Sequence, residues 1–149
     1  LTVHATGGSD MLRAAVEAAD HRLKLLAVTV LTSMGQEDLN ETGIAGPVKD
    51  HVLHLAGMAR RAGFDAVVSS PLEIVALRKM LGADFGIVIP GVRPAGAESN
   101  DQQRVATPAQ TIADGASHIV VGRPITQATD PRQAAEAILQ EMAGAKVQV

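Results

Sequence analysis

Five short runs of apolar residues, rich in β-branched side chains, alternate along the chain with longer segments of mixed apolar and polar residues. The runs lie at residues 1–3, 25–30, 66–68, 87–89 and 119–121. Polar residues do not alternate within them, which is typical of strands buried on both faces, as in parallel sheets. The pattern therefore predicts an α/β fold built from repeated strand–helix units.

The segments between the runs carry the start and stop signals of helices. Three of them open with a capping side chain, a proline, and a Glu or Gln three residues after the cap, at Ser70, Thr107 and Asp130. A glycine that can end a helix precedes three of the apolar runs, at Gly63, Gly82 and Gly115. Two helix bodies show an apolar stripe: Val48, Val52, Leu55, Ala59 and Ala62 in one, and Ala135, Ile138, Leu139 and Met142 in the other.

Five strand–helix units fit either an open doubly wound sheet or the later part of a (β/α)8 TIM barrel. With 149 residues and no linker or low-complexity segment, residues 1–149 form a single domain that is shorter than a complete barrel. The chain opens at Leu1 inside a strand-like run, without an initiator methionine. We therefore expect the C-terminal part of a TIM barrel whose N-terminal part is missing, and association of the isolated chain through its uncovered sheet edges.

Composition and charge limit the kinds of partner that the protein can bind. The net charge is −3 with both signs interspersed, which disfavours nucleic acid but permits a small anionic ligand held by arginines. No apolar run approaches the roughly 18 residues of a membrane span. The absence of cysteine rules out a disulfide framework or a thiolate metal site and favours the cytoplasm, and no signal peptide is visible.

Polar residues follow the last apolar runs, where the strand ends of a parallel sheet meet. The loop after the fourth run, residues 90–104, is longer than most strand-to-helix connections and carries the possible donors Arg93, Gln102 and Arg104. Gly122 and Arg123 follow the fifth run, where backbone N–H groups and a guanidinium can hold a phosphate. A solvated surface loop and an ordinary turn remain the alternatives for these two segments.

Other polar residues near the strand ends have two interpretations each. Thr32 and Ser33 either hydrogen-bond a ligand or cap a short helix near Asp38. His4 either lines the site or, as we favour, is a buried histidine bonded to the backbone. For the histidine pair His51 and His54, which share a helix face without an acidic or cysteine ligand, we favour a solvated face over a metal site.

No lysine is placed to do chemistry at the strand ends. Lys24 precedes its strand, Lys49 and Lys79 lie on helices, and Lys146 lies in the tail. The acids of the long loop, Glu98 and Asp101, have no obvious paired partner. The sequence thus predicts residues that grip a ligand, and it nominates no catalytic residue.

Six motifs, in order along nearly the whole chain, resemble those of orotidine 5'-phosphate decarboxylases. They are His-Ala-x-Gly-Gly from His4, Ala-Val-Thr-Val-Leu-Thr-Ser-Met from Ala27, Ser-Ser-Pro-x-Glu from Ser69, Pro-Gly-Val-Arg-Pro from Pro90, Asp-Gln-x-Arg-Val from Asp101 and Val-Gly-Arg-Pro-Ile-Thr from Val121. The resemblance implies a (β/α)8 barrel, usually a homodimer. It also implies conversion of orotidine monophosphate (OMP) to uridine monophosphate (UMP) and CO2 in pyrimidine biosynthesis, without cofactor or metal.

The resemblance also implies residue roles. Thr32 matches a position that contacts the pyrimidine ring, Pro90 abuts the ring, and Gln102 bridges base and phosphate. Arg93 lies in the loop that closes over the phosphate, and Gly122 and Arg123 match the phosphate-binding pair. The family's catalytic Asp-x-Lys-x-x-Asp motif has no counterpart here and would lie upstream, so these five units correspond to the fourth through eighth.

We therefore expect a cofactor-independent decarboxylase of which this chain alone is inactive. Two other functions stay open from the residues alone. One is another phosphate-binding barrel enzyme, such as a sugar-phosphate synthase or epimerase. The other is a non-catalytic nucleotide-binding module that begins near Leu1.

Overall fold

A computed structural model describes residues 1–94 and 104–145. The strands are β1 (Thr2–His4), β2 (Leu26–Val28), β3 (Ala66–Val68), β4 (Gly86–Ile89) and β5 (His118–Ile119). The helices are η1 (Ala5–Gly7), α1 (Gly8–Ala19), α2 (Gln36–Glu41), α3 (Val48–Ala62), η2 (Pro71–Glu73), α4 (Ile74–Leu81), α5 (Pro108–Ala113), α6 (Arg123–Thr126) and α7 (Pro131–Ala143). Within the described part of the chain, no helix is long and apolar enough to cross a bilayer.

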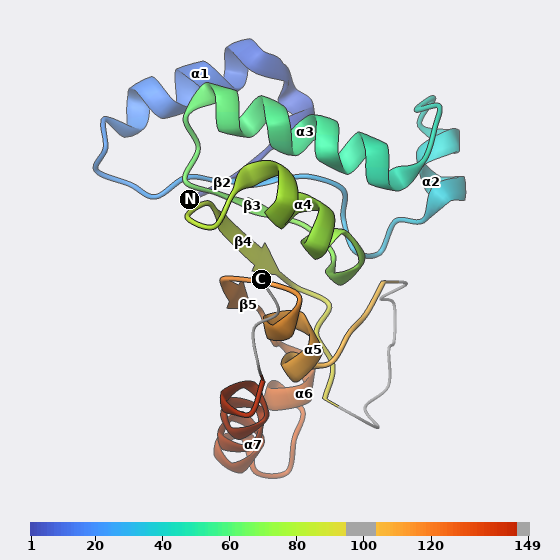
Figure 1. Ribbon diagram of the computed structural model, residues 1–149, viewed down its shortest axis with the longest axis vertical. Coiled ribbons are helices and arrows are strands. Elements are labelled where there is room, and N and C mark those ends of the chain that lie inside the picture. The colour runs from blue at the N-terminus through green and yellow to red at the C-terminus, as the bar shows by residue number, and fades with distance from the viewer. Residues whose placement is uncertain (95–103, 146–149) are drawn as a thin grey trace.

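The five strands form one sheet in which each strand pairs in parallel with the next one along the chain (Figure 1). In a doubly wound sheet the strand order reverses at a switch point and helices cover both faces. Here the order runs β1-β2-β3-β4-β5 without reversal. Of the two architectures that the sequence leaves open, the structure therefore has that of a (β/α) barrel segment.

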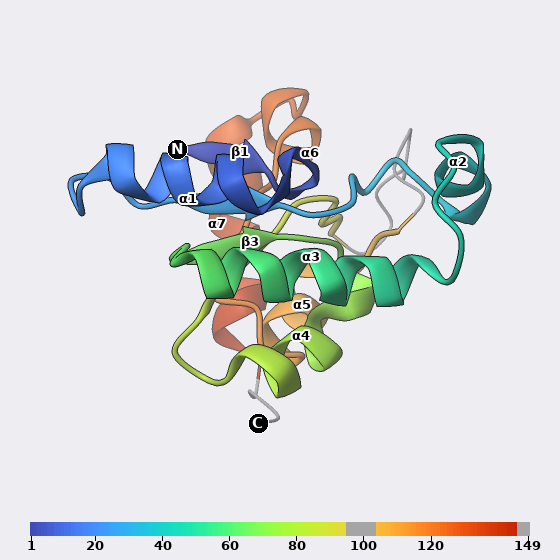
Figure 2. The ribbon, with the colours of Figure 1, turned by 90° about the horizontal axis from the view of Figure 1, so that it is seen from above.

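The hydrophobic core lies between the sheet and one helical layer. Val3, Ala27, Val67 and Ile87 are in register across the first four strands, and all belong to the core or pack against it. From the helices, α3 contributes Val52, Leu55, Ala56 and Ala59, and α4 contributes Ile74, Leu77 and Leu81. Helices α1 and α3 lie side by side over this face, as the view from above in Figure 2 also shows.

The opposite face of the sheet is not covered by the described residues. A hollow of about 670 Å³ lies against it, lined by Leu26, Ala66, Gly86, Val88 and His118 among others. The prediction that the strands are buried on both faces is therefore wrong for this structure, and Val120 keeps 50% of its surface exposed. A Cβ at position 86 would lie 2.6 Å from the Ala66 Cβ, so Gly86 permits a close approach of β3 and β4.

Most of the helix signals are confirmed. Ser70, Thr107 and Asp130 each accept a hydrogen bond from a backbone N–H of the first turn. The three helix-ending glycines have φ values of 98°, 84° and 105°. The stripe on α7 is partly wrong: Ile138 is its one buried residue and Leu139 is 62% exposed, because the contacts of α7 with α5 and α6 cover a narrower face.

Three local expectations need correction. The last strand begins and ends earlier than predicted, although the N–H of Val120 still donates to the carbonyl of Ile89 at 2.8 Å. The turn after it forms the short helix α6, which the sequence analysis did not predict. On α3, His54 is exposed as expected, but His51 is half-buried. Burial, and to a lesser extent the neighbouring His54, lower the pKa of His51.

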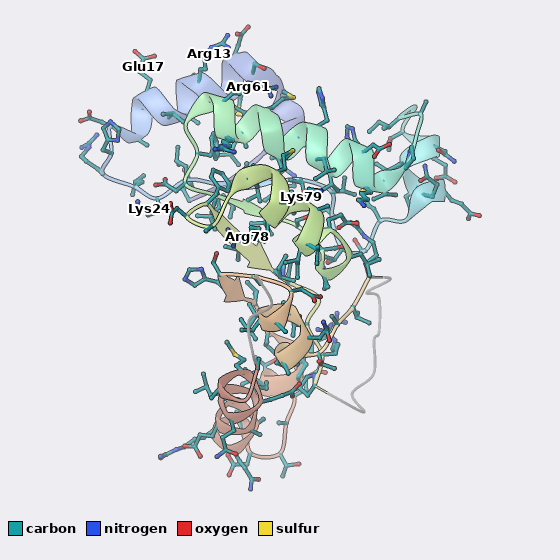
Figure 3. The ribbon with its side chains drawn as sticks, in the orientation of Figure 1. Arg13, Glu17, Lys24, Arg61, Arg78 and Lys79 are labelled. Atoms are coloured by element: carbon teal, nitrogen blue, oxygen red, sulfur yellow. The ribbon has the colours of Figure 1, made fainter. Side chains whose placement is uncertain are left out.

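One arginine ties together the loops that enter β4 and β5. The side chain of Arg78 on α4 (Figure 3) donates to the carbonyls of Gly82, Ala83, Phe85 and Gly115 at 2.7–3.0 Å and to the Ser117 hydroxyl at 3.1 Å. Burial lowers the pKa of Arg78, and the carboxylate of Asp84 opposes that shift. The planar fork of a guanidinium suits such a multiple contact, whereas an ammonium group does not.

Replacing Arg78 with alanine should lower the free energy of unfolding by about 2–3 kcal/mol, because several backbone carbonyls lose a charged donor at once. Urea unfolding of the protein that contains this chain measures the loss. Lys79→Ala is the matched control, since Lys79 is the exposed neighbour on the same helix (Figure 3) and should shift the midpoint by far less. Equal losses in the two variants would contradict the role assigned to Arg78.

Candidate ligand-binding site at the carboxyl edge of the sheet

All five strands run in the same direction, so the residues that follow them lie at one edge of the sheet. Five of the six predicted ligand residues are there: Thr32 after β2, Pro90 and Arg93 after β4, and Gly122 and Arg123 after β5. The sixth, Gln102, lies outside the described residues. The fold therefore gathers the predicted segments at one edge.

The hydrogen bonding between β2 and β3 continues one residue past the end of β2. Both the backbone N–H and the Oγ1 of Thr29 donate to the carbonyl of Val68, at 3.0 and 2.9 Å. Three residues later Thr32 is buried, with 8% of its surface exposed. The alternative in which Thr32 or Ser33 caps the helix near Asp38 is wrong, because Gly35 holds the N-cap position of α2.

The turn after β3 carries a buried carboxylate. Ser70 caps η2 by accepting a hydrogen bond from the N–H of Leu72 at 3.3 Å, and its hydroxyl donates to Oε2 of Glu73. Oε1 of Glu73 accepts from Nη1 of Arg104 at 3.0 Å, and the two side chains are only 4% and 7% exposed. The acid that reads as a capping residue in the sequence is therefore half of a buried ion pair.

Arg104 stands at the base of the loop that connects β4 to α5. Its Nη2 donates to the carbonyls of Val30 and Leu31, at 3.3 and 2.9 Å, beyond the end of β2. Two residues further on, Ala106 forms a parallel bridge with Val92, in which the N–H of Arg93 donates to the Ala106 carbonyl at 3.0 Å. The two ends of this loop are thus fastened to each other and to β2.

Arg93 is buried with 8% of its surface exposed, and its Nη1 donates to the carbonyl of Val92 at 2.9 Å. Its Nε and the Oγ of Ser69 have no hydrogen-bond partner among the described residues. Buried polar groups are normally hydrogen-bonded, so two such atoms at one edge of a sheet are suited to a polar ligand.

Gly122 is exposed at the N-cap of α6, and Arg123 is the half-buried first residue of that helix. No described atom lies within 4 Å of a Cβ built on Gly122, so the space beside its backbone is open. Pro94 and Pro124 line one hollow of about 290 Å³ together with residues of α7. The segments that carry Arg93 and Arg123 therefore lie near each other.

The structure also places the remaining polar candidates, His4 and the lysines. His4 is exposed, so the favoured interpretation of a buried histidine is wrong, because nothing among the described residues covers that side of β1. Lys24 lies at the opposite edge of the sheet (Figure 3), where its ammonium group pairs with the carboxylate of Asp65 at 2.8 Å. Lys49 and Lys79 lie on helices, as predicted, and both are exposed, while Lys146 is outside the described residues.

This chemistry suits binding rather than proton transfer. The edge offers arginines, hydroxyls and open backbone, while its buried carboxylate, Glu73, is neutralised by Arg104. Among the described residues, no set of three His, Cys, Asp or Glu side chains could hold a metal ion. The sequence alone does not predict the Glu73–Arg104 pair, because the two residues are 31 positions apart and only the folded loop brings them together.

Comparison with known proteins agrees with this picture. The family model of the orotidine 5'-phosphate decarboxylase / HUMPS family matches residues 1–138. Orotidine 5'-phosphate decarboxylases from Halorhodospira halophila and Geobacter sulfurreducens are 53% and 52% identical over 97% and 95% of this chain. The crystal structure of orotidine 5'-phosphate decarboxylase from Lactobacillus acidophilus superposes with a TM-score of 0.80 at 44% identity, over 95% of this chain and 62% of that one.

The chain spans 63% and 62% of the length of the two curated relatives. Its parallel five-stranded sheet is accordingly part of a TIM barrel. The similarity runs through every strand and through both segments that carry the predicted phosphate-binding residues. The chain belongs to the orotidine 5'-phosphate decarboxylase / HUMPS family.

Proposed function

We propose that the protein containing this chain converts OMP to UMP and CO2, and that the chain supplies the part of the site that grips the nucleotide. The observation that carries the proposal is identity above 50% to orotidine 5'-phosphate decarboxylases over nearly the whole chain. The grouping of Thr32, Arg93 and Arg123 at one sheet edge supports it. A sugar-phosphate enzyme or a non-catalytic module has no comparable support.

In this proposal the phosphate is held by the segments after β4 and β5. A guanidinium makes charge-assisted hydrogen bonds to phosphate oxygens, which is the role of Arg123 and Arg93. Gly122 leaves room for the phosphate against the backbone, since no described atom lies within 4 Å of a Cβ there. Gln102 is assigned to bridge phosphate and base.

The pyrimidine ring is placed at the ends of β2 and β4. Thr32 is assigned a contact with the ring and Pro90 packs against it. Binding energy from the phosphate, which does not react, can be used to order loops and hold the ring where the reaction occurs. In this proposal the residues of the chain therefore accelerate the reaction by positioning the substrate.

Loss of CO2 leaves an electron pair on a ring carbon, which needs a nearby cation and a proton donor. The described lysines are all away from this edge, and the edge's buried carboxylate is already paired. We assign the lysine and aspartates of the reaction to the part of the relatives' length that this chain does not span. The proposed reaction uses no cofactor or metal, and the proposed assembly is a homodimer in the cytoplasm.

The activity test compares two proteins. The natural protein that contains this chain should decarboxylate OMP, and the 149-residue chain alone should not, since the described lysines all lie away from the site. Release of CO2 or the absorbance change of the pyrimidine ring measures both. Turnover by the chain alone at the rate of the longer protein would contradict the division of roles. Thermal stabilisation by a pentose phosphate but not by UMP would contradict the substrate.

Gly122→Ala should weaken UMP binding by about tenfold or more, because a methyl group would occupy the space proposed for the phosphate. Stability should change by less than about 0.5 kcal/mol, since the new Cβ meets no described atom. Calorimetric titration of the natural protein with UMP, and with uridine as a ligand without phosphate, measures the effect.

Gly144→Ala is the matched control for this substitution. Its Cβ would also find room, with its nearest described atom 3.7 Å away, but it lies at the end of α7. UMP affinity should be unchanged in this variant. A Gly122→Ala protein that binds UMP as tightly as the parent would remove Gly122 from the phosphate site.

A further inference from the structure

Three segments that are far apart in the chain meet at one buried guanidinium. Arg104 comes from the base of the β4–α5 loop, Glu73 from the turn after β3, and the carbonyls of Val30 and Leu31 from the end of β2. The Arg104 and Glu73 side chains are 7% and 4% exposed. One side chain therefore fixes three of the loops at the carboxyl edge relative to one another.

Most of the hydrogen-bonding capacity of this cluster is used internally, while Nε of Arg104 has no partner among the described residues. Glu73 accepts from Arg104 through one oxygen and from Ser70 through the other, and both terminal nitrogens of Arg104 are engaged. The charges of the pair cancel. Both terminal nitrogens of Arg104 thus bond other segments of the chain, which makes this side chain a link between them.

The segments that Arg104 joins are those that carry proposed ligand contacts. Leu31, whose carbonyl accepts from Arg104 at 2.9 Å, directly precedes Thr32. Ala106, two residues after Arg104, accepts the backbone hydrogen bond of Arg93 at 3.0 Å. A movement of Arg104 therefore changes the place of a ring-contacting segment and of a phosphate-contacting segment together.

Stability alone is a poor account of such a pair. A buried ion pair often stabilises a fold no more than apolar side chains of similar volume, because both charges lose their hydration. What apolar residues cannot reproduce is the directed hydrogen bonding of the fork to a carboxylate and two carbonyls. The geometry points to a structural link that aligns the segments it joins.

We propose that Arg104 and Glu73 are a positioning pair, which holds the ring-binding segment at Thr32 and the phosphate-binding segment at Arg93 in the relative placement that the reaction needs. This proposal rests on the proposed decarboxylase function. The pair acts through the segments it joins and does not touch the reacting atoms.

The decisive experiment separates alignment from stability in the natural protein that contains this chain. Arg104→Met alone leaves Glu73 buried without its cation and should lower the Tm. The double variant Glu73→Leu/Arg104→Met removes both charges and should recover at least about half of that Tm loss. Its kcat/KM for OMP should nevertheless remain at least about tenfold below the parent, because the alignment is not restored. Recovery of kcat/KM together with the Tm would overturn the proposal.

Arg104→Lys provides a second test should the double variant fold poorly. It keeps a positive charge beside Glu73, but an ammonium group cannot serve the carboxylate and both carbonyls with one planar fork. We expect a small Tm loss with a fall in kcat and a rise in KM. Arg78→Lys is the control, because Arg78 is a comparable carbonyl-binding arginine at the opposite edge. It should lower the Tm and leave kcat and KM unchanged, and equal kinetic losses in both variants would overturn the proposal.

Hydrogen exchange makes the inference testable independently of activity. The amide of Arg93, which donates to Ala106, should exchange faster in the Arg104 variants, while the amide of Thr29, which donates to Val68, should not. Unchanged exchange at Arg93 would overturn the positioning role. If the parent protein does not decarboxylate OMP, the proposed function fails, and the exchange at Arg93 still decides whether Arg104 places that segment.

Discussion

Each strand of the sheet runs in the same direction and lies beside the strand that follows it. This constraint separates the molecule into two edges with different tasks. The chain enters every strand at one edge of the sheet and leaves every strand at the other. Residues as distant in sequence as Thr32 and Arg123 come to one edge without a long-range signal between them, because each one only has to follow a strand.

A guanidinium secures each edge by a different means. At the entering edge Arg78 donates to backbone carbonyls and a hydroxyl, and burial disfavours its charge. At the leaving edge Arg104 neutralises a carboxylate as well as bonding two carbonyls. The first arrangement closes loops that have only to connect elements. The second ties the loops that carry the proposed ligand contacts, and its two charges cancel.

Local patterns predicted the local features of this fold well. The caps at Ser70, Thr107 and Asp130 and the glycine at 63 are correct because capping depends on a few neighbouring residues. The errors come from packing over a distance. Leu139 follows the apolar stripe of α7 but finds no covering element, and His4 is exposed for a similar reason. The ion pair of Glu73 with Arg104 could not be predicted, because the capping pattern already gave Glu73 a plausible local role.

The close approach of β3 and β4 has a consequence for whatever closes the sheet. Ala66 and Gly86, partners in register, present little or no side chain, whereas Val68 and Val88, two residues further along the same strands, present larger ones. Side chains that pack against this face without voids must be bulky opposite the small pair and slender opposite the valines. The side-chain volumes of these strands therefore set how closely other side chains can pack against this face.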